Sequence, residues 1–192
     1  MANAPMANAP TASAPIANAS IANAPKATAM AYIGLGANLA GKPAGLRATL
    51  VSAWRSLQAL PATELLATSS LWRSAPVDAQ GPDYLNAVVA VQTEMAPLTL
   101  LHALQAIEDA HGRERPYRNA PRTLDLDLLR HGDTVLQTPE LSLPHPRLQQ
   151  RAFVLRPLLE VAPGLVELAA CLPALADQVL ERMPAGEGWP PG

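Results

Sequence analysis

The pattern of apolar and polar positions divides residues 31–183 into alternating strands and helices. Strands are predicted where apolar residues alternate or run together, and helices where they recur every three or four positions. The predicted strands span residues 31–35, 63–73, 84–93, 123–128 and 134–137. The predicted helices span residues 46–60, 97–111 and 151–160, and a last helix begins near residue 173 with its apolar face made of Leu175, Val179, Leu180 and Met183.

This element order predicts the fold class. A β-α-β-β-α-β order, followed by a short strand and C-terminal helices, is typical of a ferredoxin-like α+β sandwich. We therefore expect an antiparallel sheet with helices packed on one face and a C-terminal helical extension. The other face of the sheet would then be free to carry functional side chains.

The two ends of the chain lack such a pattern. The first thirty residues are pentads of the form X-Ala-X-Ala-X, with Lys26 as their only charge. Side chains this small bury too little apolar area to offset the entropy of ordering, so residues 1–29 are predicted to be a disordered arm. Residues 184–192, rich in Pro and Gly, are predicted to be a flexible tail, which leaves one domain over residues 30–183.

Composition and charge narrow the class of protein. The formal net charge is -2, so no overall positive field attracts nucleic acid. No apolar run approaches the roughly 20 residues that a membrane span needs. Cys171 is the only cysteine, which makes an intrachain disulfide impossible and fits a reducing compartment. We therefore expect a cytoplasmic protein without nucleic-acid or membrane partners. We also expect a monomer, although composition does not determine the oligomeric state.

Two aspartates in one predicted strand are the main candidate for chemistry. Side chains two apart on a strand share a face, so Leu124, Leu126 and Leu128 point into the core. Asp125 and Asp127 then point together from the opposite face, about 6.6 Å apart at their Cα atoms. Such a pair can share a metal ion or hold two of them. The alternative is a solvated strand face, which the depletion of Asp in strands argues against.

A run of arginines precedes this strand. Arg113, Arg115, Arg118 and Arg122 fall within ten residues that are interrupted by glycine and proline, so the segment is predicted to be a loop. Mg²⁺ takes hard oxygen ligands together with phosphate oxygens, and Arg binds phosphate through its forked guanidinium group. Taken alone, the loop favours a solvated basic surface, but beside the aspartate pair it favours a polyphosphate ligand.

Other polar residues are weaker candidates. Tyr84 and Asn86 share a face at the head of a strand, which suits a flat polar heterocycle or an ordinary sheet edge. Gln105 and Glu108 lie one helical turn apart near the arginine loop, a position that is also ordinary for solvated side chains. His145 is held between two prolines, which fits a functional residue or a surface turn. A glycine-bounded turn at residues 36–41 is a weak phosphate-binding signal.

Several separated motifs together resemble one enzyme family. The segment Arg118-Asn-Ala-Pro-Arg-Thr-Leu-Asp-Leu-Asp-Leu-Leu129 resembles the signature of 6-hydroxymethyl-7,8-dihydropterin pyrophosphokinases, which act in folate biosynthesis. The resemblance runs from about Ala31 to Pro163 and includes residues 32–39, 82–87, 107–113 and 144–153. Several motifs in order are far more specific than one Asp-x-Asp pair. Enzymes of this family move a pyrophosphoryl group from ATP to the pterin hydroxymethyl group and release AMP.

The resemblance implies a role for each candidate residue. Asp125 and Asp127 would hold two Mg²⁺ ions that bridge the triphosphate and the attacking hydroxyl group. Arg113 and Arg122 would be catalytic residues that neutralise charge on the moving group. The pterin would be bound by Ser74, Pro76, Val77, Tyr84, Asn86 and Phe153, with the two aromatic rings on either side of it. ATP would be bound by Gln105, Glu108, Arg115, His145 and Arg151.

Two other interpretations explain part of the sequence. A two-metal nucleotidyltransferase or nuclease accounts for the aspartate pair but not for the Tyr84, Asn86 and Phe153 platform. A ferredoxin-like module that binds RNA or a small molecule would need exposed aromatic residues and a positive sheet face, whereas aromatic residues make up only 4% of this chain. Metal-dependent ATP binding would favour an enzyme, and metal-independent RNA binding would favour the module.

Deletion of residues 1–28 is expected to leave the melting temperature and kcat unchanged within error. The pentads offer no apolar face that could dock on the domain. Thermal unfolding and steady-state kinetics of the full and shortened chains measure this. A fall of several degrees in the melting temperature would show instead that the arm packs against the domain.

Overall fold

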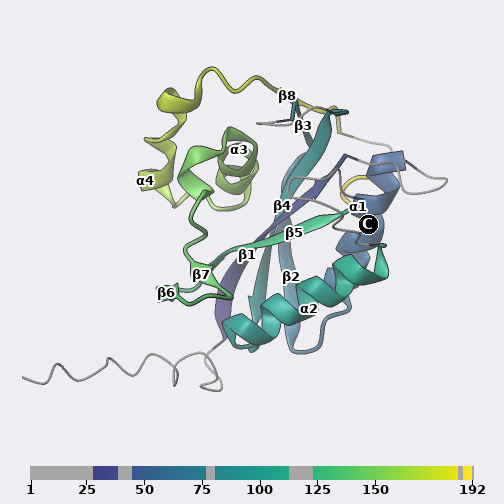
Figure 1. Cartoon of the computed structure of the whole chain (residues 1–192), viewed down its shortest axis with the longest axis vertical. Coiled ribbons are helices and arrows are strands. Elements are labelled where there is room, and N and C mark those ends of the chain that lie inside the picture. Colours follow the sequence, from purple (N-terminus) through teal and green to yellow (C-terminus); the bar gives the residue numbers. More distant parts are fainter. Residues whose placement is uncertain (1–27, 39–44, 77–80, 113–122, 186–187, 192) are drawn as a thin grey trace, which may run out of the picture.

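The computed structural model describes residues 28–38, 45–76, 81–112, 123–185 and 188–191. Within these residues the main feature is a six-stranded antiparallel sheet in the order β5-β1-β4-β3-β8, with β2 also paired to β4 (Figure 1). Its strands are β1 Ala29–Ala37, β2 Thr63–Thr68, β3 Trp72–Ser74, β4 Tyr84–Thr93, β5 Asp125–His131 and β8 Leu180–Arg182. A separate two-stranded sheet joins β6 Leu136–Gln137 to β7 Ser142–Leu143.

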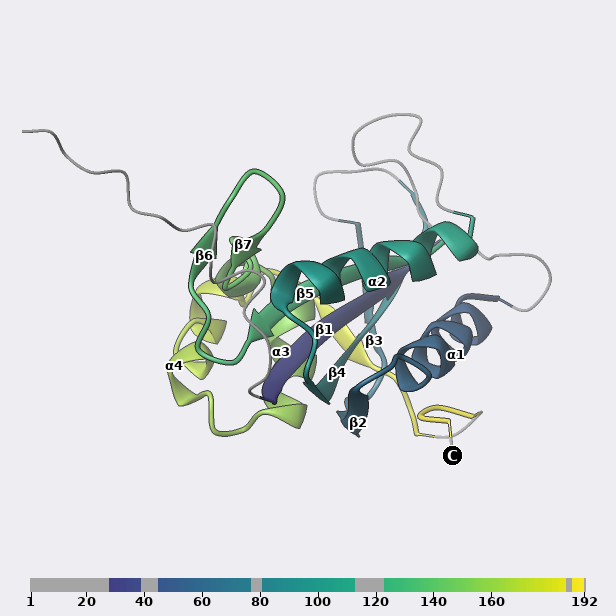
Figure 2. The ribbon, with the colours of Figure 1, turned by 90° about the horizontal axis from the view of Figure 1, so that it is seen from below.

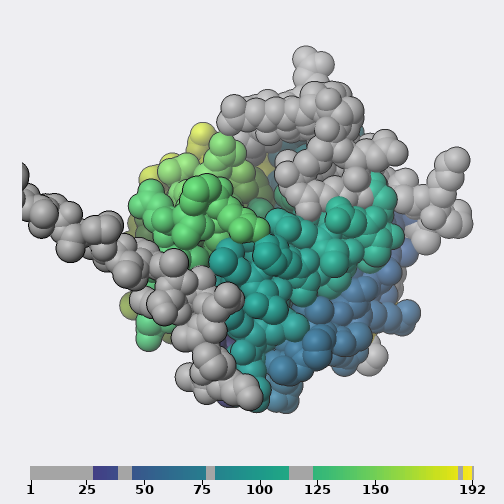
Figure 3. Space-filling model, turned by 60° about the horizontal axis from the view of Figure 1, so that its bottom comes forward, coloured from purple at the N-terminus to yellow at the C-terminus, as the bar shows by residue number. Residues whose placement is uncertain are grey.

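The helices are α1 Gly45–Gln58, α2 Pro97–Ala110, α3 Ala152–Val161 and the short α4 Val166–Ala169, with single 3-10 turns η1 Leu148–Gln150 and η2 Leu172–Leu175. Helices α1 and α2 pack side by side on one face of the sheet and form much of the outer surface in Figure 3. None of the helices in the described ranges is long and apolar enough to cross a membrane.

The main core lies between the sheet and helices α1 and α2. The helices contribute apolar stripes whose fully buried members include Leu50, Leu57, Leu100 and Leu104. Leu124, Leu126 and Leu128 are all buried in the same cluster, as the alternation predicted. Burial of one such side chain contributes about 1.5–3 kcal/mol, and a slip of one residue would turn the whole leucine row outward. The leucines therefore fix which face of β5 carries the aspartates.

Helix α3 packs against the opposite face of the sheet. Its Val154, Leu155 and Leu158 form a second buried cluster with Val88 of β4 and Leu129 of β5. Figures 1 and 2 show α3 and α4 on one side of the sheet and α1 and α2 on the other. The α+β sandwich with an antiparallel sheet is confirmed. The C-terminal extension occupies part of the aspartate face, so the open area of that face is bounded by α3.

The strand predicted over residues 63–73 is observed as two strands, β2 and β3. Between these two strands, the regular backbone hydrogen bonding is interrupted at Ser69, whose side chain bonds to strand β4. Its N–H donates to Val88 O at 2.9 Å, and its Oγ accepts the N–H of Val88 at 2.9 Å. The hydroxyl thus takes the place of a backbone carbonyl, and the pairing restarts at Trp72.

The helix predicted from residue 173 is wrong. The segment forms the single turn η2 and then the strand β8, and Val179 is 83% exposed rather than inward. The edge of β3 explains the difference, because it offers unpaired backbone groups that a strand can use and a helix cannot. Directly after β8, the N–H of Met183 donates to Leu71 O at 2.8 Å.

Candidate active site

The register of the sheet brings two of the candidate residues, Asp125 and Asn86, into one row with Gly36 and Trp72. Asp125 of β5 pairs with Gly36 of β1, Gly36 pairs with Asn86 of β4, and Asn86 pairs with Trp72 of β3. Paired residues on neighbouring strands share a face. Because Leu126 points into the main core, this row lies on the opposite face, and Asp127 lies two residues further along β5 on that same face.

Gly36 leaves an open place in the middle of the row. A Cβ atom at this position would lie 3.5 Å from Asn86 Oδ1 and 4.0 Å from Asp125 Cβ. A glycine inside a strand often marks a place where a ligand approaches the backbone closely. The bare backbone between an amide and a carboxylate is therefore suited to a flat molecule lying against the sheet.

The amide group of Asn86 is oriented by strand β3. Asn86 is buried, and its Nδ2 donates to Ser74 Oγ at 3.0 Å and to Trp72 O at 3.4 Å. Both amide hydrogens are thereby used, and Oδ1 faces the place left open by Gly36. An acceptor oxygen held in this way recognises a ligand N–H group. Tyr84 pairs with Ser74 across β4 and β3, which puts both on the same face as Asn86.

Asp125 and Asp127 are both partly exposed at this face. The side chain of Asp127 is 35% exposed, and its Oδ2 lies 3.7 Å from Arg151 Nη1. In the described part of the chain, no group of three or more His, Cys, Asp or Glu side chains could hold a metal ion. A cation held by the aspartate pair alone would complete its shell with water and ligand oxygens. That donor set fits Mg²⁺, which binds through one or two carboxylates plus phosphate oxygens.

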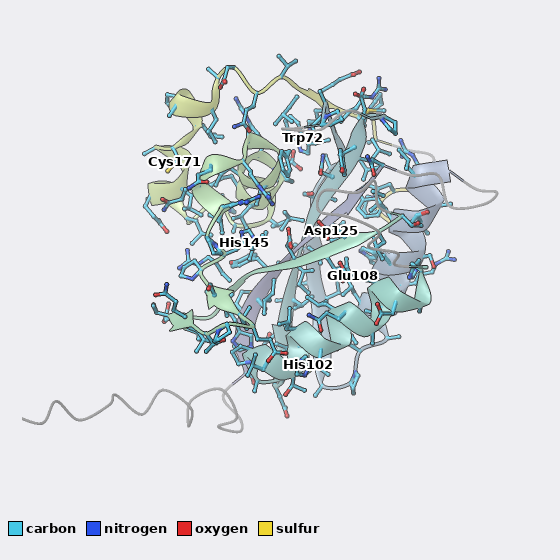
Figure 4. All side chains as sticks on the ribbon, viewed as in Figure 1. Trp72, His102, Glu108, Asp125, His145 and Cys171 are labelled. Carbon is cyan, nitrogen blue, oxygen red and sulfur yellow. The ribbon has the colours of Figure 1, made fainter. Side chains whose placement is uncertain are left out.

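Glu108 of α2 supports the aspartates from the side of the helix (Figure 4). The residue is 4% exposed, and its Oε1 accepts the N–H of Leu126 at 2.9 Å. Leu126 lies between Asp125 and Asp127 on a strand at the edge of the sheet. The carboxylate thus serves as the missing hydrogen-bond partner of the edge and fixes the backbone between the two aspartates. The ATP contact predicted for Glu108 stays a prediction.

The start of α3 borders the aspartates. Arg151 precedes the helix, and its guanidinium Cζ lies 5.5 Å from the centroid of the Phe153 ring, within the range of a cation–π contact. Since the same guanidinium group approaches Asp127, it links the acidic pair to an aromatic ring. The structure therefore places Phe153 near the acidic end of the row, and the pterin contact predicted for Phe153 stays a prediction.

His145 is neutral in this environment. Burial, and after it the positive charges of Arg151 and Arg147, lowers the pKa of His145 from 6.5 to about 4, while Asp125 acts in the opposite direction. His145 Nδ1 accepts the backbone N–H of Arg147 at 3.1 Å, which requires an unprotonated nitrogen. The proton of the neutral ring is then on Nε2, where it can be donated to an anionic ligand. Figure 4 shows His145 and Asp125 near the middle of the molecule and His102 and Cys171 toward its margins.

The fold is expected to lose stability through His145 as the pH falls from 6.5 to about 4. The imidazole binds a proton near pH 6.5 in the unfolded chain but only near pH 4 in the folded one, so its contribution is present above this window and lost through it. His145→Gln can still accept from the N–H of Arg147 and does not titrate. Thermal unfolding of both proteins across the window measures the difference. Parallel losses of melting temperature would contradict the prediction.

The structure describes most of the other predicted site residues. Ser74 is buried at the end of β3, Pro76 follows it and is half-buried, and Gln105 lies one turn before Glu108 on α2. The predictions for Val77, Arg113, Arg115 and Arg122 fall outside the described residues and stay predictions.

Sequence analysis considered Gly36 only as part of the weak phosphate-binding turn at residues 36–41, whereas the structure places it in β1 beside Asn86 and Asp125. A signal was present, because Gly34 and Gly36 alternate with apolar residues and so leave one face of the strand bare. The support that Trp72 gives to Asn86 through its carbonyl group had no sequence signal.

Comparison with known proteins decides the family. The model of the 7,8-dihydro-6-hydroxymethylpterin-pyrophosphokinase (HPPK) family matches residues 32–163. The chain belongs to the HPPK family. The pyrophosphokinase of Pseudomonas aeruginosa is 43% identical over 159 residues, which are 80% of this chain and 96% of that protein. That of Haemophilus influenzae is 44% identical over 137 residues, 71% of this chain and 83% of that protein.

Solved structures agree on the HPPK fold. The wild-type HPPK-DHPS of Plasmodium falciparum superposes with a TM-score of 0.54 at 14% identity and covers 75% of this chain. This chain spans 41% of that one, and at this identity the likeness concerns the fold alone. The HPPK match includes Gly36, Asn86, Asp125 and Phe153, and it ends at Pro163. Residues 164–192 therefore lie after the end of the family model, although the alignment with the Pseudomonas aeruginosa relative covers 80% of this chain.

Proposed function

We propose that this protein transfers the pyrophosphoryl group of ATP to the hydroxymethyl group of 6-hydroxymethyl-7,8-dihydropterin and releases AMP, a step in folate biosynthesis. The main support for this proposal is the row of paired residues Asp125, Gly36 and Asn86, which lies within the residues that match the HPPK family. It provides an acceptor for a heterocycle edge and a carboxylate pair for a polyphosphate on one sheet face. ATP is the co-substrate, as in the family.

The pterin binds on the β3–β4 side of the row. Its ring lies over Gly36 and between the rings of Tyr84 and Phe153, and its N–H edge donates to Asn86 Oδ1. The preset direction of that oxygen supports this orientation, since both Nδ2 hydrogens of Asn86 are already bonded to β3. Ser74 and Pro76 lie at the same end of the row and are assigned to the pterin site, and Val77 is assigned to it by the family resemblance. The hydroxymethyl group then points toward β5.

The triphosphate binds on the β5 side. Two Mg²⁺ ions held by Asp125 and Asp127 would neutralise phosphate charge and favour the ionised form of the attacking hydroxyl group. Arg151 lies close enough to Asp127 to bind phosphate oxygens at the same place, and neutral His145 donates its Nε2–H. The remaining ATP contacts are assigned to Gln105, Glu108 and Arg115.

Transfer is a displacement at the β-phosphorus of ATP. The hydroxyl oxygen of the pterin forms a bond to that phosphorus, the bond from the β-phosphorus to the oxygen bridging the α- and β-phosphates breaks, and AMP leaves with that oxygen. The hydroxyl proton passes to solvent. Arg113 and Arg122 are assigned to neutralise charge on the moving group. Positioning and electrostatics supply most of the catalysis in reactions of this kind, and the choice of the β-phosphorus rests on the family.

We further propose that the enzyme works as a monomer in the cytoplasm on small molecules alone, without nucleic-acid or membrane partners. The net charge of -2 supports the absence of nucleic-acid partners, and Cys171 as the only cysteine fits a reducing compartment such as the cytoplasm.

The nucleotide product tests the proposed reaction. In a mixture of protein, Mg²⁺, ATP and the reduced pterin, AMP is expected to rise in step with pterin consumption and to stay constant when the pterin is left out. Chromatography of the nucleotides measures this. ADP as the main product would indicate transfer of the γ-phosphate. Release of pyrophosphate with AMP attached to the pterin would indicate a nucleotidyltransferase.

A further inference from the structure

The C-terminal segment adds a strand next to the pterin side of the site. Strand β8 pairs with β3 residue by residue, with Trp72 opposite Arg182 and Ser74 opposite Leu180. Directly after β8, Met183 N donates to Leu71 O at 2.8 Å. Strand β3 has only three residues, so β8 supplies backbone partners on the side that β4 leaves open.

Trp189 anchors the same segment at a second point. It is 5% exposed, lies within the main core cluster, and donates Nε1–H to Ser69 O at 2.9 Å. In Figure 1 the yellow C-terminal segment passes β8 at the edge of the sheet and ends near α1. Part of the segment predicted to be a flexible tail is therefore packed against the core. Since Ser69 is bonded to Val88 as well, Trp189 fixes the residues that lead into β3.

Glu160 of α3 connects these parts. Its Oε2 accepts the N–H of Ser70 at 2.6 Å, and its Oε1 accepts from Trp72 Nε1 and from Arg182 Nε, each at 3.1 Å. One carboxylate thus joins the start of β3, the strand β8 and the helix that carries Phe153. The ion pair between Glu160 and Arg182 is partly exposed, so it contributes little to the stability of the fold. Its main effect is to hold β8 next to α3.

We propose that β8, Met183 and Trp189 form a C-terminal clamp that positions the pterin-binding side of the active site. The argument rests on the proposed function. Strand β3 orients Asn86 through Trp72 O and Ser74 Oγ, and the clamp holds the opposite edge of β3. A shift of β3 would turn Asn86 Oδ1 away from the open place at Gly36. The aspartate pair lies across the sheet on β5 and does not touch the clamp.

The clamp therefore affects one substrate more than the other. A displacement of a positioning group by about 1 Å can lower the rate about 100-fold, even when the mutation that causes it lies far from the reacting atoms. Loss of the clamp is expected to weaken pterin binding and to leave binding of Mg²⁺-ATP near its original value. A residue that only stabilises the fold would affect both substrates alike.

Three variants of the full chain test the clamp. Trp189→Phe keeps the apolar ring and removes the N–H donor, Trp189→Ala removes both, and Val179→Ala changes an exposed residue of the same segment as a control. Measurements are the dissociation constants of the pterin and of a non-hydrolysable ATP analogue with Mg²⁺, together with KM, kcat and the melting temperature. Trp189→Phe serves as the test if Trp189→Ala does not fold.

The pterin dissociation constant is expected to rise several-fold in Trp189→Phe and more than about tenfold in Trp189→Ala, on the scale of misplaced groups. The ATP analogue is expected to bind as in the original protein, and Val179→Ala to change neither constant. Equal rises in the dissociation constants of both ligands, or no rise in the pterin dissociation constant of Trp189→Phe, would contradict the proposed clamp. Absence of AMP formation by the unaltered protein would refute the proposed function instead, so the two failures are distinguishable.

Discussion

Replacement of Asp125 or Asp127 by Asn is expected to abolish turnover and to leave the melting temperature of the metal-free protein equal or higher. Both carboxylates lie on the face opposite the leucine core, so neither substitution disturbs the packing of that core. Each substitution removes a Mg²⁺ ligand and also a repulsion between like charges. Asp127 also has a partly exposed ion pair with Arg151 at 3.7 Å, and its loss is expected to offset part of the gain in Asp127→Asn.

Initial rates over a range of Mg²⁺ concentrations and thermal unfolding without metal measure the two effects. Asp133→Asn is a matched control, because Asp133 is an exposed acid just after the end of β5. It is expected to change neither rate nor melting temperature. An aspartate-pair variant that keeps most of its activity at limiting Mg²⁺ would contradict the metal-binding role.

Replacement of Gly36 by Val is expected to lower kcat/KM for the pterin by about 100-fold or more, the scale of a displaced reactant. The branched side chain would fill the place between Asn86 Oδ1 and Asp125, which lie 3.5 and 4.0 Å from the position of a Cβ atom. Val is favoured in strands and Gly is not, so the melting temperature is expected to be equal or higher. A blocked site and an intact fold are thus expected in the same variant.

A graded pair makes the test sharper. Gly36→Ala adds a single Cβ in ordinary contact with Asn86 and is expected to have a much smaller effect than Gly36→Val. Steady-state kinetics with the pterin varied, together with thermal unfolding of each variant, give the comparison. If Gly36→Val bound the pterin as tightly as the original protein, the substrate would not lie over β1.

The elements that could be predicted from sequence are those in which buried apolar residues recur at a regular spacing along the chain. Strand β4 runs from Tyr84 to Thr93 as predicted, and the alternation in β5 placed both aspartates on the correct face. Helix α2 begins at Pro97, where the sequence placed its start. The family resemblance, carried by several motifs in order, is confirmed by the HPPK match. Each of these inferences uses neighbours within a few residues along the chain.

The parts that could not be predicted depend on partners far along the chain. Nothing local indicates that Asp125 and Asn86 are both neighbours of Gly36, because sheet register joins residues from three strands. The segment after Pro173 has helical spacing, yet it pairs with the free edge of β3. Trp189 follows a Pro- and Gly-rich stretch that is typical of a tail, and its burial depends on a carbonyl group 120 residues earlier.

The central claim is that the aspartate pair and Asn86 serve one reaction site on one sheet face. The most direct test replaces Mg²⁺ with paramagnetic Mn²⁺ and follows the proton relaxation of the pterin, bound together with a non-hydrolysable ATP analogue. The relaxation of the hydroxymethyl protons is expected to be strongly enhanced, more than that of the protons on the pterin ring, and the enhancement is expected to vanish in Asp127→Asn. A pterin that binds in the presence of the metal and the analogue but shows no enhancement would contradict the account.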